Sequence, residues 1–208
     1  MTREIYRAAD PAAALVLAHG AGAGSGSAWM VNAARAIADQ GITVATFDFP
    51  YITAGRKVPD RAPALEVHWR PVLEEARREF AALPLFIGGK SMGGRIASHI
   101  AAQGVEGVTG LVFFGYPLHP PGQPEKRRDA HLPSITLPML FVQGALDTFG
   151  DEAEMRELVA RLPTATLHVI AGGDHSFKVR GGASAVRKAF DDAIGAAVAW
   201  MRRVSKAG

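Results

Sequence analysis

Short apolar runs alternate with helix-length amphipathic segments along most of this chain, and this alternation restricts its fold more than any other feature. Each run is four to six residues long, continuous and mostly apolar. Such runs are typical of parallel strands that are buried on both faces of a sheet. The predicted strands are Ala13–Ala18, Thr43–Phe47, Leu85–Gly88, Gly110–Phe114, Pro138–Gln143 and Ala165–Ile170.

The segments between these runs place apolar residues at helical spacing. The predicted helices are Ser27–Gln40, Leu65–Ala82, Gly93–Gln103, Asp151–Leu162 and Ala183–Arg203, with Asp151 as an N-cap. Strands and helices in alternation predict an α/β fold, with a mostly parallel sheet of about six to seven strands covered by helices on both faces.

One stretch, residues 115–137, contains five prolines where a crossover helix could have lain. It predicts an extended loop over the carboxyl edge of the sheet, where ligands bind in open α/β sheets. No segment has the size of a large lid domain, so residues 1–208 are expected to form a single domain with an open site.

Composition narrows the function classes. The chain has no cysteine, which excludes disulfides, thiolate-bound metals and a cysteine nucleophile. Its net charge is +3, but Lys and Arg are dispersed, which argues against nucleic-acid binding. The longest apolar runs are far shorter than the roughly 20 residues that span a bilayer, and the N-terminus lacks a signal-peptide core. We therefore expect a soluble, cytoplasmic protein that does not bind membranes.

The strongest motif is Gly89-Lys90-Ser91-Met92-Gly93, which matches G-x-S-x-G between a predicted strand and a predicted helix. A sharp strand-to-helix turn strains the central residue, and glycines beside it avoid clashes. The turn would lift the Ser91 hydroxyl clear of the sheet as a nucleophile. The alternative is a glycine-rich turn that serves packing alone.

A serine hydroxyl needs a base to take its proton, and in this arrangement the acid and the histidine follow on loops after later strands. Asp147 follows the fifth predicted strand, and His175 follows the sixth after two glycines. Two other carboxylates lie nearby, but Asp151 is better explained as a helix cap, and Asp174 is adjacent to the histidine in sequence. The other histidines do not occupy the corresponding position; these are His19, His68, His99, His119, His131 and His168.

Acyl transfer also needs donors for a developing oxyanion. The first predicted strand ends in a glycine-rich loop, His19 to Gly24, so the N–H of Met92 is expected to pair with that of Ala21 or Gly22. A phosphate-binding loop is the competing interpretation. It fails because the loop lacks the third glycine of G-x-G-x-x-G, and because Gly-Lys-Ser in the motif lacks the preceding P-loop glycine.

Several basic residues are expected at the same edge of the sheet and lead to the hypothesis that the substrate is anionic. They are Arg56, Lys57, Lys90, Lys126, Arg127, Arg128, Lys178 and Arg180. The alternative is that they are solvated loop charges partly paired with Asp60, Glu125 and Asp129. Met92, Trp29, Phe149 and Phe177 could line an acyl pocket or could equally be core residues, and for Trp29 the core is the preferred interpretation.

Together these segments resemble a known family. The blocks HGAGAGS, FDFPY, GRKVPDR, GGKSMGGR, FFGYPLHPPGQPEKRR, LFVQGALDTFG and GGDHSFK resemble α/β-hydrolases related to dienelactone hydrolase. Within that group the chain is similar to the branch of testis-expressed protein 30 and KAT8 regulatory NSL complex subunit 3. The resemblance implies an α/β-hydrolase fold with Ser91, Asp147 and His175 in the triad positions. Dienelactone hydrolases proper use a cysteine nucleophile, so their lactone substrate is not carried over.

We therefore expect a serine hydrolase, carboxylesterase-like, that cleaves a small ester, thioester or related acyl substrate through an acyl-enzyme, with no metal and no cofactor. The alternative is a non-catalytic α/β-hydrolase-fold module that binds or scaffolds other proteins, because one large relative is a subunit of a chromatin complex. The sequence predicts no oligomeric state.

Overall fold

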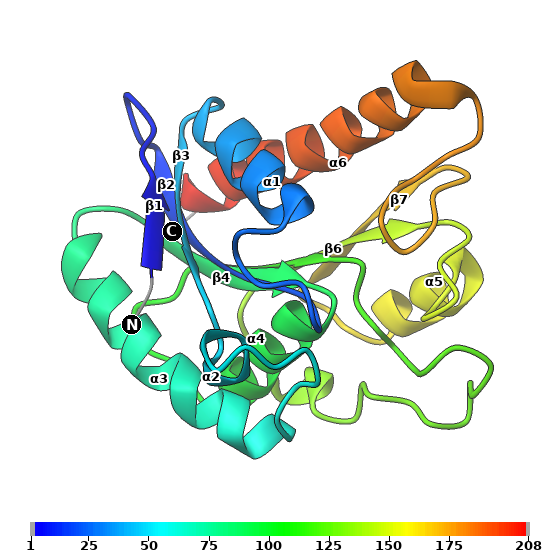
Figure 1. Ribbon diagram of the computed structural model, residues 1–208, viewed down its shortest axis with the longest axis horizontal. Helices are drawn as coiled ribbons and strands as arrows, with labels where there is room; N and C mark the ends of the chain where they lie inside the picture. Colours follow the sequence, from blue (N-terminus) through cyan, green and yellow to red (C-terminus); the bar gives the residue numbers. More distant parts are fainter. Residues whose placement is uncertain (1–2, 207–208) are drawn as a thin grey trace.

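The computed structural model describes residues 3–206, which form a seven-stranded sheet in the order β1-β3-β2-β4-β5-β6-β7 (Figure 1). β1 pairs antiparallel with β3, and every other neighbouring pair is parallel. The strands are β1 Arg3–Tyr6, β2 Ala13–Ala18, β3 Ile42–Phe47, β4 Leu85–Lys90, β5 Gly110–Phe114, β6 Met139–Gly144 and β7 Ala165–Ile170. The predicted mostly parallel sheet is confirmed.

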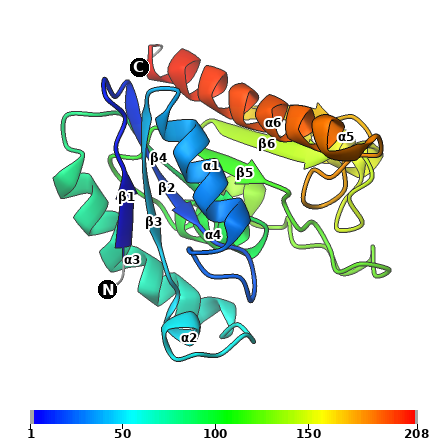
Figure 2. The ribbon, with the colours of Figure 1, turned by 45° about the horizontal axis from the view of Figure 1, so that its top comes forward.

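Helices cover both faces of this sheet (Figures 1 and 2). They are α1 Ala28–Ala38, α2 Pro50–Thr53, α3 Ala62–Glu79, α4 Met92–Ala102, α5 Glu152–Ala160 and α6 Gly182–Ser205, with a single 3₁₀ turn at Leu132–Ser134. α1 and α6 lie side by side on one face, and α3, α4 and α5 cover the other. Asp151 caps α5 as predicted, since its Oδ1 accepts a hydrogen bond from the Glu154 N–H at 3.0 Å.

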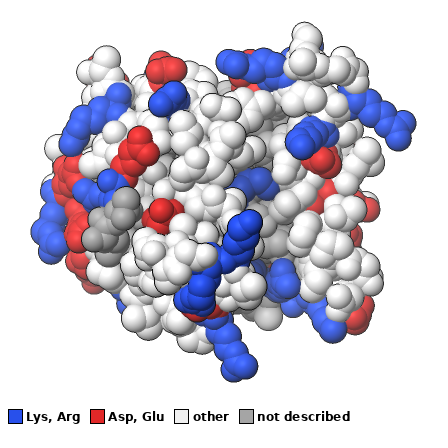
Figure 3. Space-filling model, viewed as in Figure 1, with Lys and Arg blue, Asp and Glu red and all other residues white. Residues whose placement is uncertain are grey.

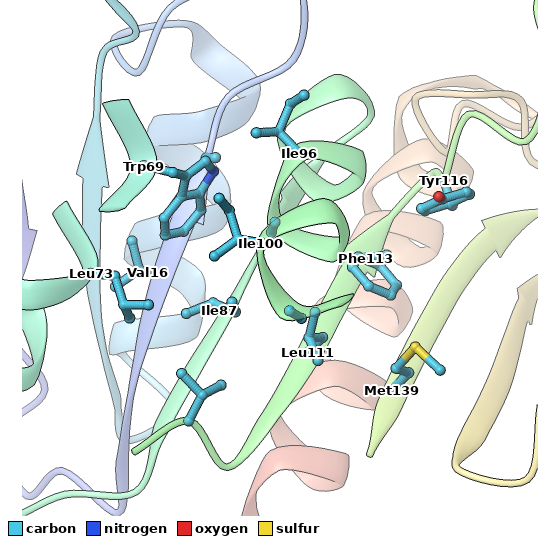
Figure 4. Close-up of a cluster of buried hydrophobic side chains, with 14 of the residues drawn as sticks. Val16, Trp69, Leu73, Ile87, Ile96, Ile100, Leu111, Phe113, Tyr116 and Met139 are labelled. Carbon is cyan, nitrogen blue, oxygen red and sulfur yellow. The ribbon is translucent and has the colours of Figure 1, made fainter. Parts of the chain in front are cut away.

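Alternation of side chains along the strands builds two hydrophobic cores. Val16, Ile87 and Phe113 point towards α3, α4 and α5, as the close-up in Figure 4 shows. Their neighbours, such as Leu15 and Phe86, point towards α1 and α6. Because both faces are covered, the central strands are apolar throughout, which is why they appear in the sequence as continuous runs.

The chain reverses its direction across the sheet between β2 and β4. After β2 it crosses to β3 on one side, and after β3 it returns past β2 to β4 on the other side. α1 and α4, which follow β2 and β4, lie on opposite faces of the sheet. The loops after β2 and β4 therefore diverge and leave a crevice at the carboxyl edge, the place where open α/β sheets bind ligands.

Three short elements escaped sequence analysis: β1, α2 and the 3₁₀ turn at Leu132–Ser134. β1 is a short edge strand with half-exposed charged and polar residues, so it lacks the apolar run of a buried strand. α2 spans only four residues, too few to show a helical period. The other elements differ from prediction by a few residues at their ends; α3, for example, begins three residues before Leu65.

The proline-rich stretch at residues 115–137 is a loop, but its course differs from the predicted one. Leu118, Leu132 and Ile135 belong to the core that α3, α4 and α5 share. The stretch therefore packs on that face of the sheet in place of a crossover helix, instead of extending only over the carboxyl edge. The loop takes this course because burying its apolar side chains against the core removes them from water.

The described part of the chain, residues 3–206, has no inserted lid domain; its helices all cover the sheet or its loops. Among the same residues, no helix is long and apolar enough to cross a membrane.

Candidate active site

Ser91 occupies the turn between β4 and α4 in a strained backbone conformation, with φ 51° and ψ −119°. Two glycines make this turn possible. A Cβ on Gly89 would lie 2.5 Å from the Ala18 carbonyl oxygen, and one on Gly93 would lie 2.4 Å from the same atom. Any side chain at either position would push β2 and the start of α4 apart, so the G-x-S-x-G pattern has a steric cause.

His175 lies on a tight loop after β7, and its Nε2 is 2.8 Å from the Ser91 Oγ. The neighbouring carboxylate of Asp174 shapes this loop, because its Oδ1 accepts hydrogen bonds from the N–H groups of Ser176 and Lys178 at 2.8 and 2.9 Å. Asp174 therefore holds the loop in place and does not orient the imidazole, as expected from its position beside the histidine in sequence.

Asp147 is the carboxylate that reaches the imidazole. Its Oδ2 accepts a hydrogen bond from His175 Nδ1 at 2.7 Å, and its Oδ1 accepts one from the Phe149 N–H at 2.8 Å. An ionised carboxylate can only accept, so the His175 ring carries its proton on Nδ1 and leaves Nε2 free to accept from Ser91. The side chain of Asp147 is fully buried, so water does not compete for these hydrogen bonds, which hold the imidazole in its orientation.

A buried amide that sequence analysis overlooked supports the acid. Gln143 Nε2 donates to Asp147 Oδ2 and to the Gly150 carbonyl, both at 2.9 Å, while its Oε1 accepts from the Tyr116 N–H at 2.8 Å. The side chain thus ties the acid loop to the end of β5. The available signal was a single polar residue inside an otherwise apolar strand, which marks a buried polar group with partners.

The loop after β2 faces the serine, and only part of the predicted donor set is available there. The Gly22 N–H donates to the Tyr51 hydroxyl at 3.1 Å, so it is already engaged. Within residues 3–206, the N–H groups of Ala21 and Met92 have no hydrogen-bond partner. Of the two N–H groups that were predicted to act with that of Met92 as oxyanion donors, only the Ala21 N–H is therefore unoccupied.

His19 lies beneath this loop as a structural support. Its Nδ1 donates to the Gly20 carbonyl at 2.7 Å, and its Nε2 accepts from the Phe49 N–H at 3.2 Å. Burial lowers its pKa below the usual 6.5, which favours the neutral ring that can make both bonds. Sequence analysis excluded His19 as the base without finding this role, because the contact with Phe49 spans thirty positions.

A cavity of about 300 Å³ opens beside Ser91. Gly20, Ala21, Trp29 and Phe149 contribute to its walls, together with Lys90 and Ser176. The Phe149 ring lies against the His175 imidazole, with 4.3 Å between ring centroids. Phe177, in contrast, is buried and does not line this cavity. Trp29 is half-buried: it packs against the core shared by α1 and α6, as predicted, and it also lines the cavity.

Lys90 directly precedes Ser91 and has an unusual environment. Its ammonium donates to the His175 carbonyl and lies 5.7 Å from the ring centroids of both Trp29 and Phe177. Burial lowers its pKa to about 8 from the usual 10.5, against the opposing attraction of Asp147 and Asp174. The cation therefore braces the histidine loop from within the protein.

The other basic residues predicted to bind substrate do not line the cavity beside Ser91. Arg56 pairs with Asp60 at 2.8 Å, and Arg127 pairs with Asp129 at 2.6 Å, as expected of loop charges. Lys57 follows Arg56 on the same exposed loop. Figure 3 shows Lys and Arg dispersed over one face of the molecule among acidic and uncharged residues.

A second serine–histidine pair lies elsewhere, between Ser98 Oγ and His131 Nε2 at 2.7 Å. Ser98 is fully buried, and its hydroxyl donates to the Arg95 carbonyl at 2.7 Å, so the pair places His131 Nε2 as the donor. Burial also lowers the pKa of His131 to about 4. This pair therefore lacks a base that could take the serine proton.

Metal ligands do not cluster in the described chain: residues 3–206 contain no group of three or more His, Cys, Asp or Glu side chains arranged to hold an ion.

Several solved structures have a similar arrangement of strands and helices. An alpha-beta serine hydrolase homologue from Coxiella burnetii has a TM-score of 0.75 at 16% identity, covering 93% of this chain and 90% of that one. Est1E from Butyrivibrio proteoclasticus, with ferulic acid bound, has a TM-score of 0.74 at 12% identity, with 95% and 94% covered. Dienelactone hydrolase from Anabaena variabilis has a TM-score of 0.73 at 18% identity, with 95% and 89% covered. These likenesses show the fold.

One curated relative is much longer. Polyketide synthase ThaQ from Burkholderia thailandensis is 38% identical over 108 residues, which are 52% of this chain but only 4% of the synthase.

The family model described as "Alpha/beta hydrolase domain" matches residues 11–202. That match begins just before β2 and ends within α6, so it takes in both sides of the crevice and every loop that meets there. This chain belongs to the alpha/beta hydrolase family.

Proposed function

We propose that this protein is a serine hydrolase that cleaves a small ester, thioester or related acyl substrate, with Ser91 as nucleophile, His175 as base and Asp147 as the acid that orients it. The observation that carries the proposal is one continuous hydrogen-bonded series. Ser91 Oγ lies 2.8 Å from His175 Nε2, and His175 Nδ1 lies 2.7 Å from Asp147 Oδ2. Both distances suit proton transfer and ring orientation.

In the first step, Ser91 Oγ attacks the acyl carbonyl carbon while its proton passes to His175 Nε2. The carbonyl oxygen gains negative charge, and the free N–H groups of Met92 and Ala21 are the proposed donors to it. The buried carboxylate of Asp147 stabilises the imidazolium through its bond to Nδ1. When the tetrahedral intermediate collapses, the bond to the leaving group breaks, and His175 gives that group its proton.

In the second step, water attacks the acyl-enzyme, His175 Nε2 takes the water's proton, and the proton returns to Ser91 as the acid product leaves. The cavity beside Ser91 is open to solvent, so water can reach the acyl group. Apart from the substrate and the water, every group that these two reaction steps require is a side chain or backbone N–H of the chain itself.

The cavity volume of about 300 Å³ suits the reacting part of a small organic acyl compound. Est1E, which shares the fold, is described with ferulic acid bound, and a compound of that size fits the proposal. Membership of the branch of testis-expressed protein 30 and KAT8 regulatory NSL complex subunit 3 stays a prediction from the sequence motifs.

Labelling with a fluorophosphonate, followed by intact-mass measurement, tests this proposal without knowledge of the substrate. The wild type is expected to gain one adduct, because the reagent needs only an activated hydroxyl. Ser91→Ala removes the attacking oxygen and His175→Ala removes the base, so neither variant is expected to gain an adduct on the same timescale.

Ser98→Ala is the matched control, because Ser98 also lies in hydrogen-bonding contact with a histidine. This variant is expected to label like the wild type. An adduct that survives Ser91→Ala but disappears in Ser98→Ala would place the reactive hydroxyl on α4 and refute the proposal. A folded wild type that gains no adduct would favour the non-catalytic binding module instead.

A further inference from the structure

A second and larger cavity, of about 740 Å³, lies between α1 and α6. We call it the α1–α6 groove. Trp29 and Ser176 line both this groove and the cavity beside Ser91. The two spaces are therefore neighbours that share one indole ring and one loop residue in their walls, and Ser176 directly follows the proposed base.

The walls of the groove are mostly apolar. Ala36 from α1 and Val186 and Phe190 from α6 face it, and Trp29 and Phe177 close the end near His175. All of these side chains except Val186 belong to the core shared by α1 and α6 or pack against it, and four of the five are only partly buried. A ligand that covers them would remove apolar surface from water, worth about 25 cal/mol per Å².

The rim of the groove is positively charged. Arg35, Lys178 and Arg187 line it, with Asp39 as the only carboxylate among the lining residues. Arg187 already pairs with Asp191, one helical turn further along α6. Within residues 3–206, Arg35 and Lys178 have no carboxylate partner within 4.0 Å, so both cations are available to an anionic ligand.

We propose that the α1–α6 groove binds the acyl chain of the substrate, and that this chain is apolar along its length and ends in an anionic group. The inference rests on the proposed serine hydrolase function. Because the two cavities share Trp29 and Ser176 in their linings, they are neighbours, and in this proposal one molecule occupies both, with its carbonyl at Ser91 and its tail in the groove. An occupant attached through the acyl carbon stays bound through both chemical steps, so its binding energy acts on each.

This arrangement specifies where the anionic group of the hypothetical substrate would bind. Arg56 and Arg127, which sequence analysis considered, pair with carboxylates, whereas Lys178 and the previously unconsidered Arg35 line the groove. The proposed site for the anionic group therefore lies in the groove and outside the cavity beside Ser91.

Three p-nitrophenyl esters test the inference in the full-length chain: the acetate, the octanoate and the monoester of octanedioic acid. For the wild type, kcat/KM is expected to rise from acetate to octanoate and to rise again, by about tenfold, for the octanedioate because two cations meet its free carboxylate. Val186→Trp fills the groove, so it is expected to lower the octanoate-to-acetate ratio of kcat/KM by about tenfold.

The double variant Arg35→Gln/Lys178→Gln is expected to abolish the preference for octanedioate over octanoate while keeping the preference for octanoate over acetate. Lys188→Gln is the matched control, because Lys188 lies on α6 beside Arg187 but does not line the groove. It is expected to keep both preferences.

The outcomes separate the two proposals. Hydrolysis of the acetate with no gain from chain length or from the terminal carboxylate would overturn the groove inference and leave the serine hydrolase intact. The groove inference is also overturned if Lys188→Gln loses the octanedioate preference as fully as the double variant. Failure of every ester, together with failure of fluorophosphonate labelling, would overturn the serine hydrolase proposal itself.

Discussion

The role that the sequence predicts for Lys90 differs from the role that its contacts in the folded chain indicate. Beside Ser91, the proposed nucleophile, it was predicted to bind substrate, yet its ammonium contacts the His175 carbonyl and two aromatic rings. Its side chain lines the cavity, but its charge is used to hold the loop that carries the imidazole. A buried cation of this kind has a free-energy cost that depends on pH.

This cost gives a prediction for Lys90→Met. Below about pH 8 both the folded and the unfolded chain hold the Lys90 proton, and the folded state carries a buried charge. Between pH 8 and 10.5 the folded chain loses this proton first, so the unfolded chain binds more protons and stability rises with pH. The free energy of unfolding of the wild type is therefore expected to rise relative to Lys90→Met, by up to roughly 3 kcal/mol across that interval.

Urea denaturation at a series of pH values measures this difference. Lys188→Met is the control, because it removes an exposed lysine from α6 and its difference from the wild type is expected to stay constant. A constant difference for Lys90→Met as well would show that the Lys90 ammonium is not destabilised in the folded protein.

At the scale of elements, the turn between β4 and α4 depends on close backbone contacts. Gly88 lies so near β5 that a Cβ would be 1.8 Å from the Val112 carbonyl oxygen, and Gly93 lies against the end of β2. The same contacts bring the start of α4 and its free N–H groups up to the loop at Ala21. The motif is thus a packing requirement of three neighbouring strands as well as a frame for Ser91.

Gly93→Ala is expected to destabilise the protein by about 3 kcal/mol or more, because a new Cβ at 2.4 Å from the Ala18 carbonyl must displace rigid backbone. It is also expected to slow fluorophosphonate labelling, since the displaced backbone leads directly into the Ala21 loop. Thermal or urea unfolding gives the first quantity and the rate of adduct formation gives the second.

Gly195→Ala is the matched control on α6, where a Cβ meets nothing within 4 Å. Helix propensity predicts that this variant is more stable than the wild type by about 0.5–1 kcal/mol. If Gly93→Ala matched it, the close approach at the turn would not be a constraint on the fold.

At the scale of the whole molecule, the sheet separates two cores. Ile37 on α1 belongs to the core shared with α6, and Ile100 on α4 belongs to the core on the opposite face. Both side chains are buried, and the two cores share no side-chain partners across the sheet. Losses in the two cores should therefore be independent of each other.

Ile37→Val and Ile100→Val are each expected to lower the free energy of unfolding by about 0.5–1.5 kcal/mol. The double variant is expected to lose the sum of the two single losses to within about 0.5 kcal/mol. Urea denaturation of the four proteins measures this. A coupling free energy well above that limit would show that a change in one core alters the packing of the other core across the sheet.

Much of this architecture could be predicted because local pattern and global fold agree. Buried parallel strands must be apolar on both faces, so the five central strands were visible as continuous runs. Of the two edge strands, β7 still has a mostly apolar run and was predicted, whereas β1 does not and was missed. The loops that carry Ser91, Asp147 and His175 follow directly from the strand order, and the folded chain brings their side chains within 2.8 Å of one another in series. Their catalytic roles stay a proposal.

Only the tertiary structure decided the details that depend on partners far away in the sequence. The Tyr51 hydroxyl occupies the Gly22 N–H, Gln143 holds Asp147, and the His175 carbonyl takes the Lys90 ammonium. The α1–α6 groove likewise exists because two helices more than 140 residues apart lie side by side. A periodic pattern records which face of an element is buried, whereas a hydrogen bond or a groove depends on which distant surface that face meets.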